Sequence, residues 1–312
     1  MNYCFQNILL LVAFLFCGNI TNAQLPNDKF GKPSTEEWNF TGWDDAVDAD
    51  AVILYKSMKV LYQLPAQLYV LGQEDPDGMP DNHPDFGESQ NTENGVVVNY
   101  EFNLRTKILT PDGARHADID ITFYDAVNDK NFTSDELYDL KIKVFSKNEK
   151  GKVVKKSVST KSFIKERLDD NYMVMHVVVP DVQPGDIIEY QYKVTSFRYT
   201  YLYNWMFQEC IPTVRTRCDI EIPAFLQFNM NVPENDLVKW YAQPDHITYD
   251  ANRRDMKKAK SCPSNHYYIT GDNILPSSVT GRKLPQLTSR LVSSNDSSPA
   301  MMPESSTHLK IK

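Results

Sequence analysis

Alternation of apolar and polar residues with a period of two is the feature that most constrains this chain's fold. Residues 117–123 alternate strictly, residues 140–145 alternate again, and residues 187–194 keep the same rhythm. Successive side chains of a β-strand point to opposite faces of the sheet, so this period is typical of strands with one buried face. Residues that favour tight turns stand between the runs, which predicts short antiparallel strands.

The turn residues extend this pattern over most of the chain. Asp112-Gly113 predicts a hairpin between residues 96–109 and 117–123, because glycine accepts the positive φ of such a turn. No long helical period separates the strands, which argues against βαβ units. We expect an all-β fold, mainly an antiparallel β-sandwich, with minor short helices and a disordered C-terminal tail. The other strand-like runs are residues 172–179, 213–222 and 225–232, and the short helices are expected near residues 46–57 and 160–168.

The N-terminus carries a targeting segment. Residues 8–16 form an unbroken apolar run that is too short to span a bilayer as a helix, and Ala23 supplies the small residue that signal peptidase requires. We therefore expect residues 1–23 to be a signal peptide and the protein to be exported, that is periplasmic, at the cell surface or secreted. Cys17 follows the run, but the bulky Phe16 before it argues against lipidation. No other stretch is long enough to span a bilayer, so no membrane partner is expected after cleavage.

Three stretches depart from the strand rhythm. Residues 24–45 are a polar lead-in, residues 73–94 are an acidic inserted loop, and residues 271–312 are rich in Ser and Pro. The remaining segment, residues 46–270, is expected to form one β-sandwich domain that contains the loop. We expect residues 271–312 to be disordered or the remnant of a truncation.

The composition supports a folded domain and gives no sign of nucleic-acid binding. Hydrophobic residues make up 41% of the chain and aromatic residues 12%, which is enough to build a core. The formal net charge is -8 at pH 7, and no long run of Lys and Arg appears. The electrostatic pattern of a nucleic-acid-binding protein is therefore missing.

The sequence offers no convincing catalytic set, so we expect no enzymatic activity and no cofactor. Cys210 and Cys218 lie within predicted strands, and no cysteine opens a helix, where the N-terminal dipole would lower a thiol pKa. His176 lies in an apolar strand and is expected to be a satisfied face or core residue. Cys262 and His266 are four residues apart, but no second pair completes a zinc site.

Two candidate sites remain open. Asp75, Asp77 and Asp81 surround a Gly turn and could bind Ca²⁺ through carboxylate oxygens; the alternative is a solvated loop stiffened by proline. Cys210 and Cys218 flank a turn-like stretch and could form a disulfide in an oxidising compartment. The alternative is that both are small buried hydrophobic residues.

Glu189 interrupts an apolar strand between Ile188 and Tyr190. Strand alternation predicts that its side chain faces solvent. The alternative is a carboxylate that pairs with a nearby arginine and ties the sheet together. A cluster of aromatic residues follows this strand, and it either lines a carbohydrate or peptide groove or forms core and cross-strand pairs. The cluster comprises Tyr199, Tyr201, Tyr203 and Trp205.

Several short segments occur in an order that resembles a known family. They are Asp50-Ala51-Val52-Ile53-Leu54-Tyr55, Arg105-Thr106-Lys107-Ile108-Leu109 with Asp112-Gly113, Gly151-Lys152-Val153-Val154, Val179-Pro180-Asp181-Val182, Pro184-Gly185-Asp186-Ile187-Ile188-Glu189-Tyr190, Trp205-Met206-Phe207-Gln208, Ile211-Pro212 and Ile222-Pro223. Over residues 48–235 the chain resembles the N-terminal β-domain of Bacteroidetes-type DUF3857 domain-containing proteins. In that family the domain usually precedes a transglutaminase-like domain.

The resemblance implies an exported accessory β-domain that works beside a transglutaminase-like partner, in cis or in trans. The family's catalytic Cys, His and Asp would lie in that following domain; after Asn273 this chain has no Cys and a single His, His308. Two alternatives stay open: a truncated fragment of a secreted transglutaminase-like enzyme, and a stand-alone module that binds a glycan or peptide. An apolar docking patch would favour a partner domain, and a groove with exposed Trp or Tyr would favour the binding module.

Overall fold

The structure, a computed structural model, describes residues 29–42, 48–64, 95–127, 134–159, 163–250 and 259–291. The helices are α2 (Thr35–Asn39), the 3-10 helix η2 (Pro111–His116) and α3 (Ser277–Thr280). The strands are β1 (Ala51–Gln63), β2 (Val97–Ile108), β3 (Ile119–Tyr124), β4 (Glu136–Lys147), β5 (Val153–Ser157), β6 (Phe163–Arg167), β7 (Tyr172–Val177), β8 (Ile187–Ser196), β9 (Thr213–Pro223), β10 (Phe228–Asn231), β11 (Val238–Asp250), β12 (Ala259–Ile274) and β13 (Thr288–Leu291).

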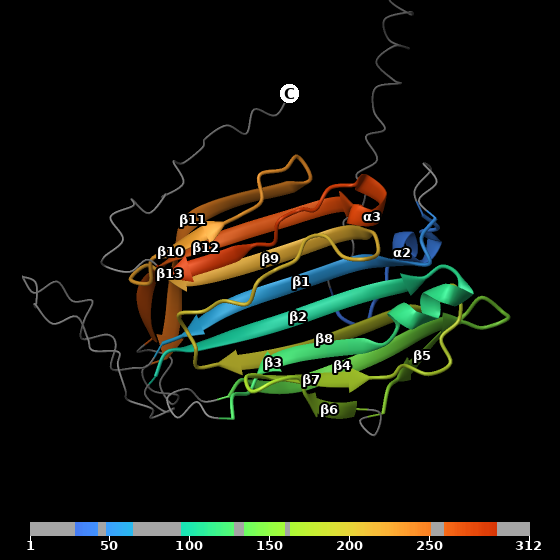
Figure 1. Cartoon of the computed structure of the whole chain (residues 1–312), viewed down its shortest axis with the longest axis horizontal. Helices are drawn as coiled ribbons and strands as arrows, with labels where there is room; N and C mark the ends of the chain where they lie inside the picture. Colours follow the sequence, from blue (N-terminus) through green and yellow to red (C-terminus); the bar gives the residue numbers. More distant parts are fainter. Residues whose placement is uncertain are drawn as a thin grey trace, which may run out of the picture.

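One large sheet dominates the molecule. Its eight strands stand in the order β11-β12-β9-β1-β2-β8-β4-β5 (Figure 1). All neighbouring strands are antiparallel except β1 and β9, which run parallel. The mainly antiparallel all-β fold with few short helices confirms the expectation from the sequence. The parallel pair near the centre of the sheet was not predicted.

The central strand β1 corrects one predicted helix. Residues 51–55 are apolar without interruption and buried along their whole length, because other elements cover both faces of the sheet here. The helix predicted near 46–57 is therefore wrong. The helix predicted near 160–168 is wrong as well, since Phe163–Arg167 forms β6. Periodicity alone cannot distinguish a short buried strand from a helix.

The inner face of the large sheet, which carries Met58, Tyr100 and Val194, holds the main core. Two separate covers pack on it. The three-stranded sheet β3-β7-β6 covers one end, where Ile121 and Val177 contribute to a shared apolar cluster. The two-stranded sheet β10-β13 and the irregular segment 197–212 cover the other end. The inner face therefore has a boundary between two covers.

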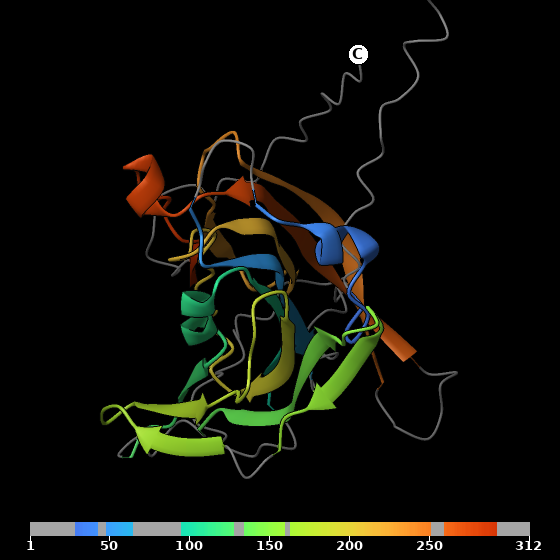
Figure 2. The same ribbon diagram turned by 90° about the vertical axis from the view of Figure 1, so that its right-hand side faces the viewer.

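The outer face is mostly polar, and one end of it is crossed by the N-terminal strap, residues 29–42. Trp38 and Phe40 of the strap pack on a small apolar cluster that includes Phe145 and Ile187. The strap and the three-stranded sheet lie on opposite sides of the large sheet (Figure 2). The polar lead-in of residues 24–45 was expected to lie outside the strand pattern; its described part covers the sheet.

The hairpin predicted at Asp112-Gly113 is not formed. The segment instead forms η2, and β2 and β3 lie in different sheets. Gly113 does not adopt a positive φ, but a Cβ atom there would lie 2.0 Å from the carbonyl oxygen of Asp50. Glycine is required here by close packing and not by the turn conformation for which it was predicted.

The first part of the segment predicted to be a disordered tail is folded. Residues 271–291 complete β12 and form α3 and β13, and β13 pairs with β10. Residues 292–312 lie outside the described part, as do the predicted signal peptide, residues 1–23, and the predicted acidic loop, residues 73–94. Among the described residues, no helix combines the length and the hydrophobicity needed to cross a bilayer.

Candidate functional site

The sites predicted from the sequence have mixed outcomes. Asp75, Asp77 and Asp81 lie outside the described residues, so the calcium prediction remains a prediction. The disulfide is not formed: Cys210 is an exposed free thiol and Cys218 is a buried one. The alternative prediction, that both cysteines are buried, is confirmed for Cys218, which is fully buried on the inner face of β9, and is wrong for Cys210. Within the described ranges, no group of three or more His, Cys, Asp or Glu side chains is arranged to hold a metal ion.

Among the described residues, no thiol has a histidine as its hydrogen-bond partner. Burial raises the pKa values of the Cys218 and Cys262 thiols, which is the opposite of what a nucleophilic cysteine requires. His176 lies on an exposed strand face with Asp120 2.6 Å from its Nδ1. His266 contacts Asp219 through Nε2, and its Nδ1 lies 2.8 Å from the hydroxyl oxygen of Tyr268.

The inner face is open at the boundary between its two covers. There a crevice of about 250 Å³ lies between β1, β2 and β8 on one side and the irregular segment 203–209 on the other, next to β3. It is lined mainly by aromatic and aliphatic side chains. The lining includes Phe102, Leu104, Tyr190, Tyr192, Val194, Tyr203 and Trp205, together with Lys56, Asn204, Met206 and Glu209.

The floor of the crevice is a ladder of nearly parallel rings. Tyr192 and Phe102 stack with their ring centroids 4.6 Å apart and their planes 15° apart. Tyr190 continues the ladder beyond Tyr192, at 6.2 Å and 13°, and Tyr100 continues it beyond Phe102, at 6.1 Å and 13°. The ladder follows from the register, in which Phe102 on β2 stands opposite Tyr192 on β8. All but Tyr100 are only half-buried, so the ladder presents apolar surface to the opening.

The wall of the crevice is held in place by hydrogen bonds. The indole nitrogen of Trp205 donates to the hydroxyl of Thr216 at 2.8 Å, and the backbone of Trp205 pairs with Leu287. The hydroxyl of Tyr203 donates to a carboxylate oxygen of Asp135 at 2.5 Å. These contacts fix the segment that faces the ring ladder.

A buried lysine anchors the same wall. Lys56 lies on β1 with 2% of its surface exposed, and its ammonium group binds the carbonyl of Met206 and the carboxylate of Glu209. The ammonium also lies 4.7 Å from the centroid of the Trp205 ring. Burial lowers the pKa of Lys56, and the neighbouring carboxylate of Glu209 opposes that shift. In the sequence, Lys56 directly follows the apolar run of residues 51–55. A charged residue at that place in a buried strand is the signal that could have identified it.

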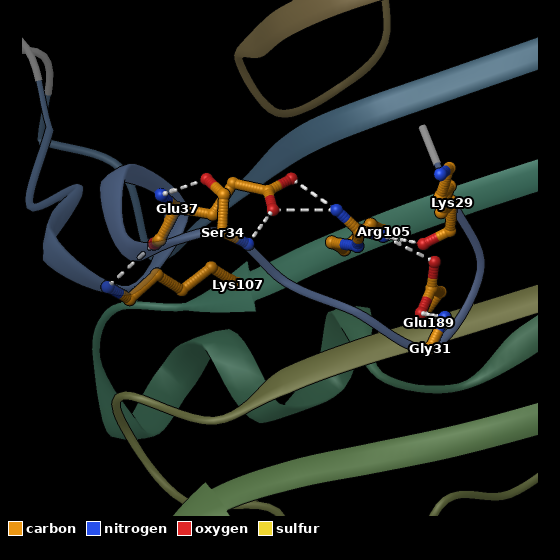
Figure 3. Close-up of polar contacts among 7 residues, drawn as sticks. All are labelled: Lys29, Gly31, Ser34, Glu37, Arg105, Lys107 and Glu189. Atoms are coloured by element: carbon orange, nitrogen blue, oxygen red, sulfur yellow. Dashed lines mark hydrogen bonds and ion pairs between the residues drawn. The ribbon is translucent and has the colours of Figure 1, made fainter. Parts of the chain in front are cut away.

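Glu189 belongs to a buried ionic cluster on the outer face (Figure 3). Arg105 donates to Glu189 at 2.6 Å and to both carboxylate oxygens of Glu37 at 2.6 Å. The side chains of Arg105 and Glu189 are fully buried and that of Glu37 is 4% exposed. The prediction that Glu189 faces solvent is therefore wrong, and the alternative of a carboxylate paired with an arginine is confirmed.

The cluster ties the strap to the sheet. The backbone N–H of Gly31 donates to Glu189 at 2.6 Å, and the carbonyl of Lys29 accepts from Arg105 at 3.1 Å (Figure 3). Lys107 donates to the carbonyls of Trp38 and Phe40 at 2.6 and 2.7 Å. Burial raises the pKa of Glu189 despite the nearby guanidinium of Arg105.

Glu37 reaches this cluster from a capped helix. Ser34 accepts a hydrogen bond from the Glu37 backbone N–H, and the Glu37 carboxylate accepts one from the Ser34 N–H at 2.6 Å. This reciprocal pair is a capping box, and it holds the carboxylate over Arg105. The Ser-Thr-Glu-Glu sequence of residues 34–37 carries the signature, which sequence reasoning missed. The carboxylates of Glu37 and Glu189 are both engaged by Arg105 and by backbone N–H groups, so the cluster is a structural tie, and the crevice is the better candidate for ligand binding.

A comparison with known protein families supports the resemblance. Residues 98–260, just over half of the chain, match the family described as "Domain of Unknown Function with solved-structure structure (DUF3857)". A comparison with curated proteins finds no match. Among solved structures, the chain is similar to a crystal structure from Parabacteroides distasonis ATCC 8503 that is named a "putative protease". The two share 14% identity with a TM-score of 0.47 over 78% of this chain. The chain spans 40% of the length of that protein.

Proposed function

We propose that this chain, which belongs to the DUF3857 family, is an exported, non-catalytic accessory β-module that binds an extended peptide segment in its inner-face crevice. We further propose that it works beside a transglutaminase-like domain, in cis or in trans, to which it presents that segment. The observation that carries the proposal is the opening between the two covers, with its floor of half-buried rings. Small-molecule and peptide sites are typically concave and mostly apolar, with a few fixed polar groups.

The polar groups of the crevice favour a peptide. The ammonium of Lys56 is already bound to Met206 and Glu209, so it adds rigidity and leaves few donors free for an outside ligand. The second carboxylate oxygen of Glu209 and the amide of the exposed Asn204 remain near the opening. A peptide could place an apolar side chain on the ring ladder and direct a backbone N–H at Glu209. It would then use both the apolar and the polar surface of the crevice.

The state of two of the three described thiols, Cys218 and Cys262, supports a non-catalytic role for the described residues. Cysteine nucleophiles react as thiolates, so they need a lowered pKa and an adjacent base. The pKa values of Cys218 and Cys262 are raised by burial, and Cys262 donates weakly to a backbone carbonyl, that of Pro263. The transglutaminase-like partner of the proposal would supply its own catalytic residues.

A glycan is the second candidate ligand. The parallel rings of Tyr190, Tyr192 and Phe102 could stack against sugar rings, as aromatic side chains do in many carbohydrate sites. A glycan site also needs several free hydrogen-bonding groups around each sugar. Because a peptide site does not need so many of these groups, a binding experiment can distinguish a glycan ligand from a peptide ligand.

Titration calorimetry on the exported full chain tests the proposal. The probes are blocked tetrapeptides with Leu or Phe at the centre, blocked tetrapeptides of Gly and Ser, and tetrasaccharides of β-linked glucose and N-acetylglucosamine. We expect the apolar tetrapeptides to bind and the Gly-Ser peptides to bind at least tenfold more weakly. Tyr192→Ala should lower the affinity at least about tenfold, because it removes a ring from the floor.

Tyr241→Ala is the matched control. Tyr241 is also a tyrosine on a strand of the large sheet, but it is 58% exposed on the edge strand β11, away from the crevice. We expect this variant to bind the peptides like the unmodified chain. If only the tetrasaccharides bind, the ligand of the crevice is a glycan and the peptide proposal is wrong. Absence of all binding, or equal losses in the two variants, would contradict the assignment of the crevice.

A further inference from the structure

The β4–β5 hairpin concentrates positive charge in an acidic protein. Residues 141–159, which we call the basic hairpin, contain seven lysines and one acidic residue, Glu149. The formal net charge of the whole chain is -8. A positively charged segment in a protein whose net charge is negative produces a local positive potential, and this potential attracts anionic partners.

Most of these lysines are not neutralised by the protein itself. Within the described ranges, Lys141 pairs with Asp139, and five others take part in no ion pair. All five are exposed, and they lie on both sides of the turn between the strands. They are Lys147, Lys150, Lys152, Lys155 and Lys156. The hairpin therefore presents its charge to solvent.

Neighbouring lysines also repel one another within and beside the hairpin. The pKa of Lys143 is lowered by partial burial and then by the adjacent Lys155. The pKa of Lys107 is lowered by burial and then by Lys147. An accumulation of like charge is relieved when an anionic surface binds to it.

Exposed apolar side chains accompany the charge. Val153 and Val154 follow the turn and are 43% and 40% exposed, one on each side of β5. Lys152 precedes them and Lys155 follows them. The turn lies at the end of the large sheet where α2 lies, at the margin of the molecule (Figure 1). Two apolar residues flanked by lysines on a protruding hairpin suit an interface of lipid headgroups and acyl chains.

We infer that the basic hairpin binds the surface of a membrane that contains anionic lipids, with Val153 and Val154 entering the headgroup region and the surrounding lysines contacting the phosphates. An acidic protein would satisfy the lysines, but it would leave the two valines without a role. Each lysine near an anionic membrane surface contributes about a fivefold gain in affinity. This inference departs from the sequence-based expectation of no membrane partner, because that expectation considered only segments that span the bilayer and this binding is peripheral.

Lysines on an edge strand have another known role, because they hinder aggregation through exposed strand edges. β5 is an edge strand, so this role must be distinguished from lipid binding. A lysine-to-glutamate change keeps the edge charged and therefore keeps this protection. It reverses the interaction with anionic lipid.

Vesicle co-sedimentation of the exported full chain tests the inference. The vesicles contain phosphatidylglycerol with phosphatidylethanolamine, or phosphatidylcholine alone. We expect binding to the phosphatidylglycerol vesicles at 50 mM salt, loss of most of it at 500 mM, and none to phosphatidylcholine. Lys155→Glu with Lys156→Glu should weaken binding at least about tenfold. Val153→Ser with Val154→Ser should weaken it severalfold without removing the salt dependence.

The control variant reverses two exposed lysines elsewhere, Lys239→Glu with Lys283→Glu. It makes the same change in net charge as the hairpin variant, and we expect it to bind nearly as well as the unmodified chain. Thermal unfolding of each variant establishes that it is folded. Equal losses in both charge variants, or equal binding to phosphatidylcholine, would overturn the inference. Soluble polyglutamate that binds as tightly as the vesicles, with no effect of the valine changes, would identify an acidic polypeptide as the occupant and would overturn it as well.

Discussion

Arg105 shows how one residue can organise an end of this fold. It is fully buried on β2, where it satisfies two carboxylates that come from β8 and from the strap. A buried ion pair adds little net stability relative to apolar packing, because desolvation offsets the attraction. Removal of one partner is different, since it leaves uncompensated charge inside the protein.

The Arg105→Leu variant therefore tests the role of this buried cluster. The variant would leave Glu37 and Glu189 buried beside each other without a cation, so we expect the free energy of unfolding to fall by about 3–5 kcal/mol. Urea unfolding followed by circular dichroism measures it. Arg115→Leu is the control, because Arg115 pairs with Asp50 at 2.6 Å but is 65% exposed, and exposed pairs contribute about 0–1 kcal/mol. Similar losses in the two variants would contradict the role given to the buried cluster.

His176 provides a prediction about pH. The hydrogen bond that His176 makes to the carboxylate of Asp120 raises the pKa of His176 above its ordinary value of 6.5, and Glu166 acts in the same direction. The stabilisation from this pair is complete below the ordinary pKa and is lost as the pH rises through the raised one. We expect the imidazole resonances of His176 to titrate above pH 6.5, and Asp120→Asn to shift that titration downward. An NMR titration that finds the same midpoint in both proteins would show that the pair does not act on His176.

Glu189 also shows what a local pattern can and cannot predict. Alternation correctly assigned it to the polar face of its strand, opposite the side chains of Ile188 and Tyr190. It could not show that residues 29–42, more than 140 positions earlier, cover that face and bury the carboxylate. The capping box at Ser34 and Glu37 was present in the sequence, but its partner Arg105 is distant in the chain.

The connection between β2 and β3 illustrates the same limit at the level of elements. Asp112-Gly113 predicted a turn, and the chain does change direction there, but η2 carries it from one layer to the other. Leu109 and Thr110 donate to the carbonyl of Asp50 at 2.9 and 3.1 Å, which holds η2 against the start of β1. The close contact at Gly113 depends on that packing, and a dipeptide pattern does not contain it.

Gly113→Ala tests this packing. The added Cβ would lie 2.0 Å from the Asp50 carbonyl oxygen, so the backbone would have to move. We expect a loss of about 1–3 kcal/mol in the free energy of unfolding, as is typical of overpacking. Gly95→Ala is the control, since no atom lies within 4 Å of a Cβ there and the φ angle is not positive. Chemical denaturation of both variants measures the difference, and a neutral Gly113→Ala would contradict the contact.

Whether a strand could be predicted from the sequence depended on whether its residues alternate between a buried and an exposed face. Strands with one buried face, such as β4 and β8, were located from their alternation and turns. β1 and β6 were missed as strands, because an uninterrupted apolar run and a short exposed segment both lack a period-two signal. Pairing order, including the parallel pair β1 and β9, depends on contacts between distant residues and was not accessible to local reasoning.

The whole molecule is a large sheet whose two faces differ in character. The inner face carries the core under two separate covers, and the crevice lies between them. The outer face is polar and is tied to the strap at one end. From the sequence, Tyr203 and Trp205 were expected either to line a groove or to form part of the core. In the structure they do both, because they form the wall of the crevice and also pack against the core. The position of the crevice follows from the arrangement of the layers, which the sequence could not supply.

The most direct test of the central claim is to map where a peptide binds. Amide chemical shifts of the perdeuterated full chain are recorded during titration with the apolar blocked tetrapeptide. The account predicts that the largest changes fall in residues 102–104, 190–194 and 203–209, around the crevice, with little change at Tyr241 and Tyr268 on the outer face. Changes centred on the outer face, or spread evenly over the molecule, would contradict the claim that the crevice is the binding site.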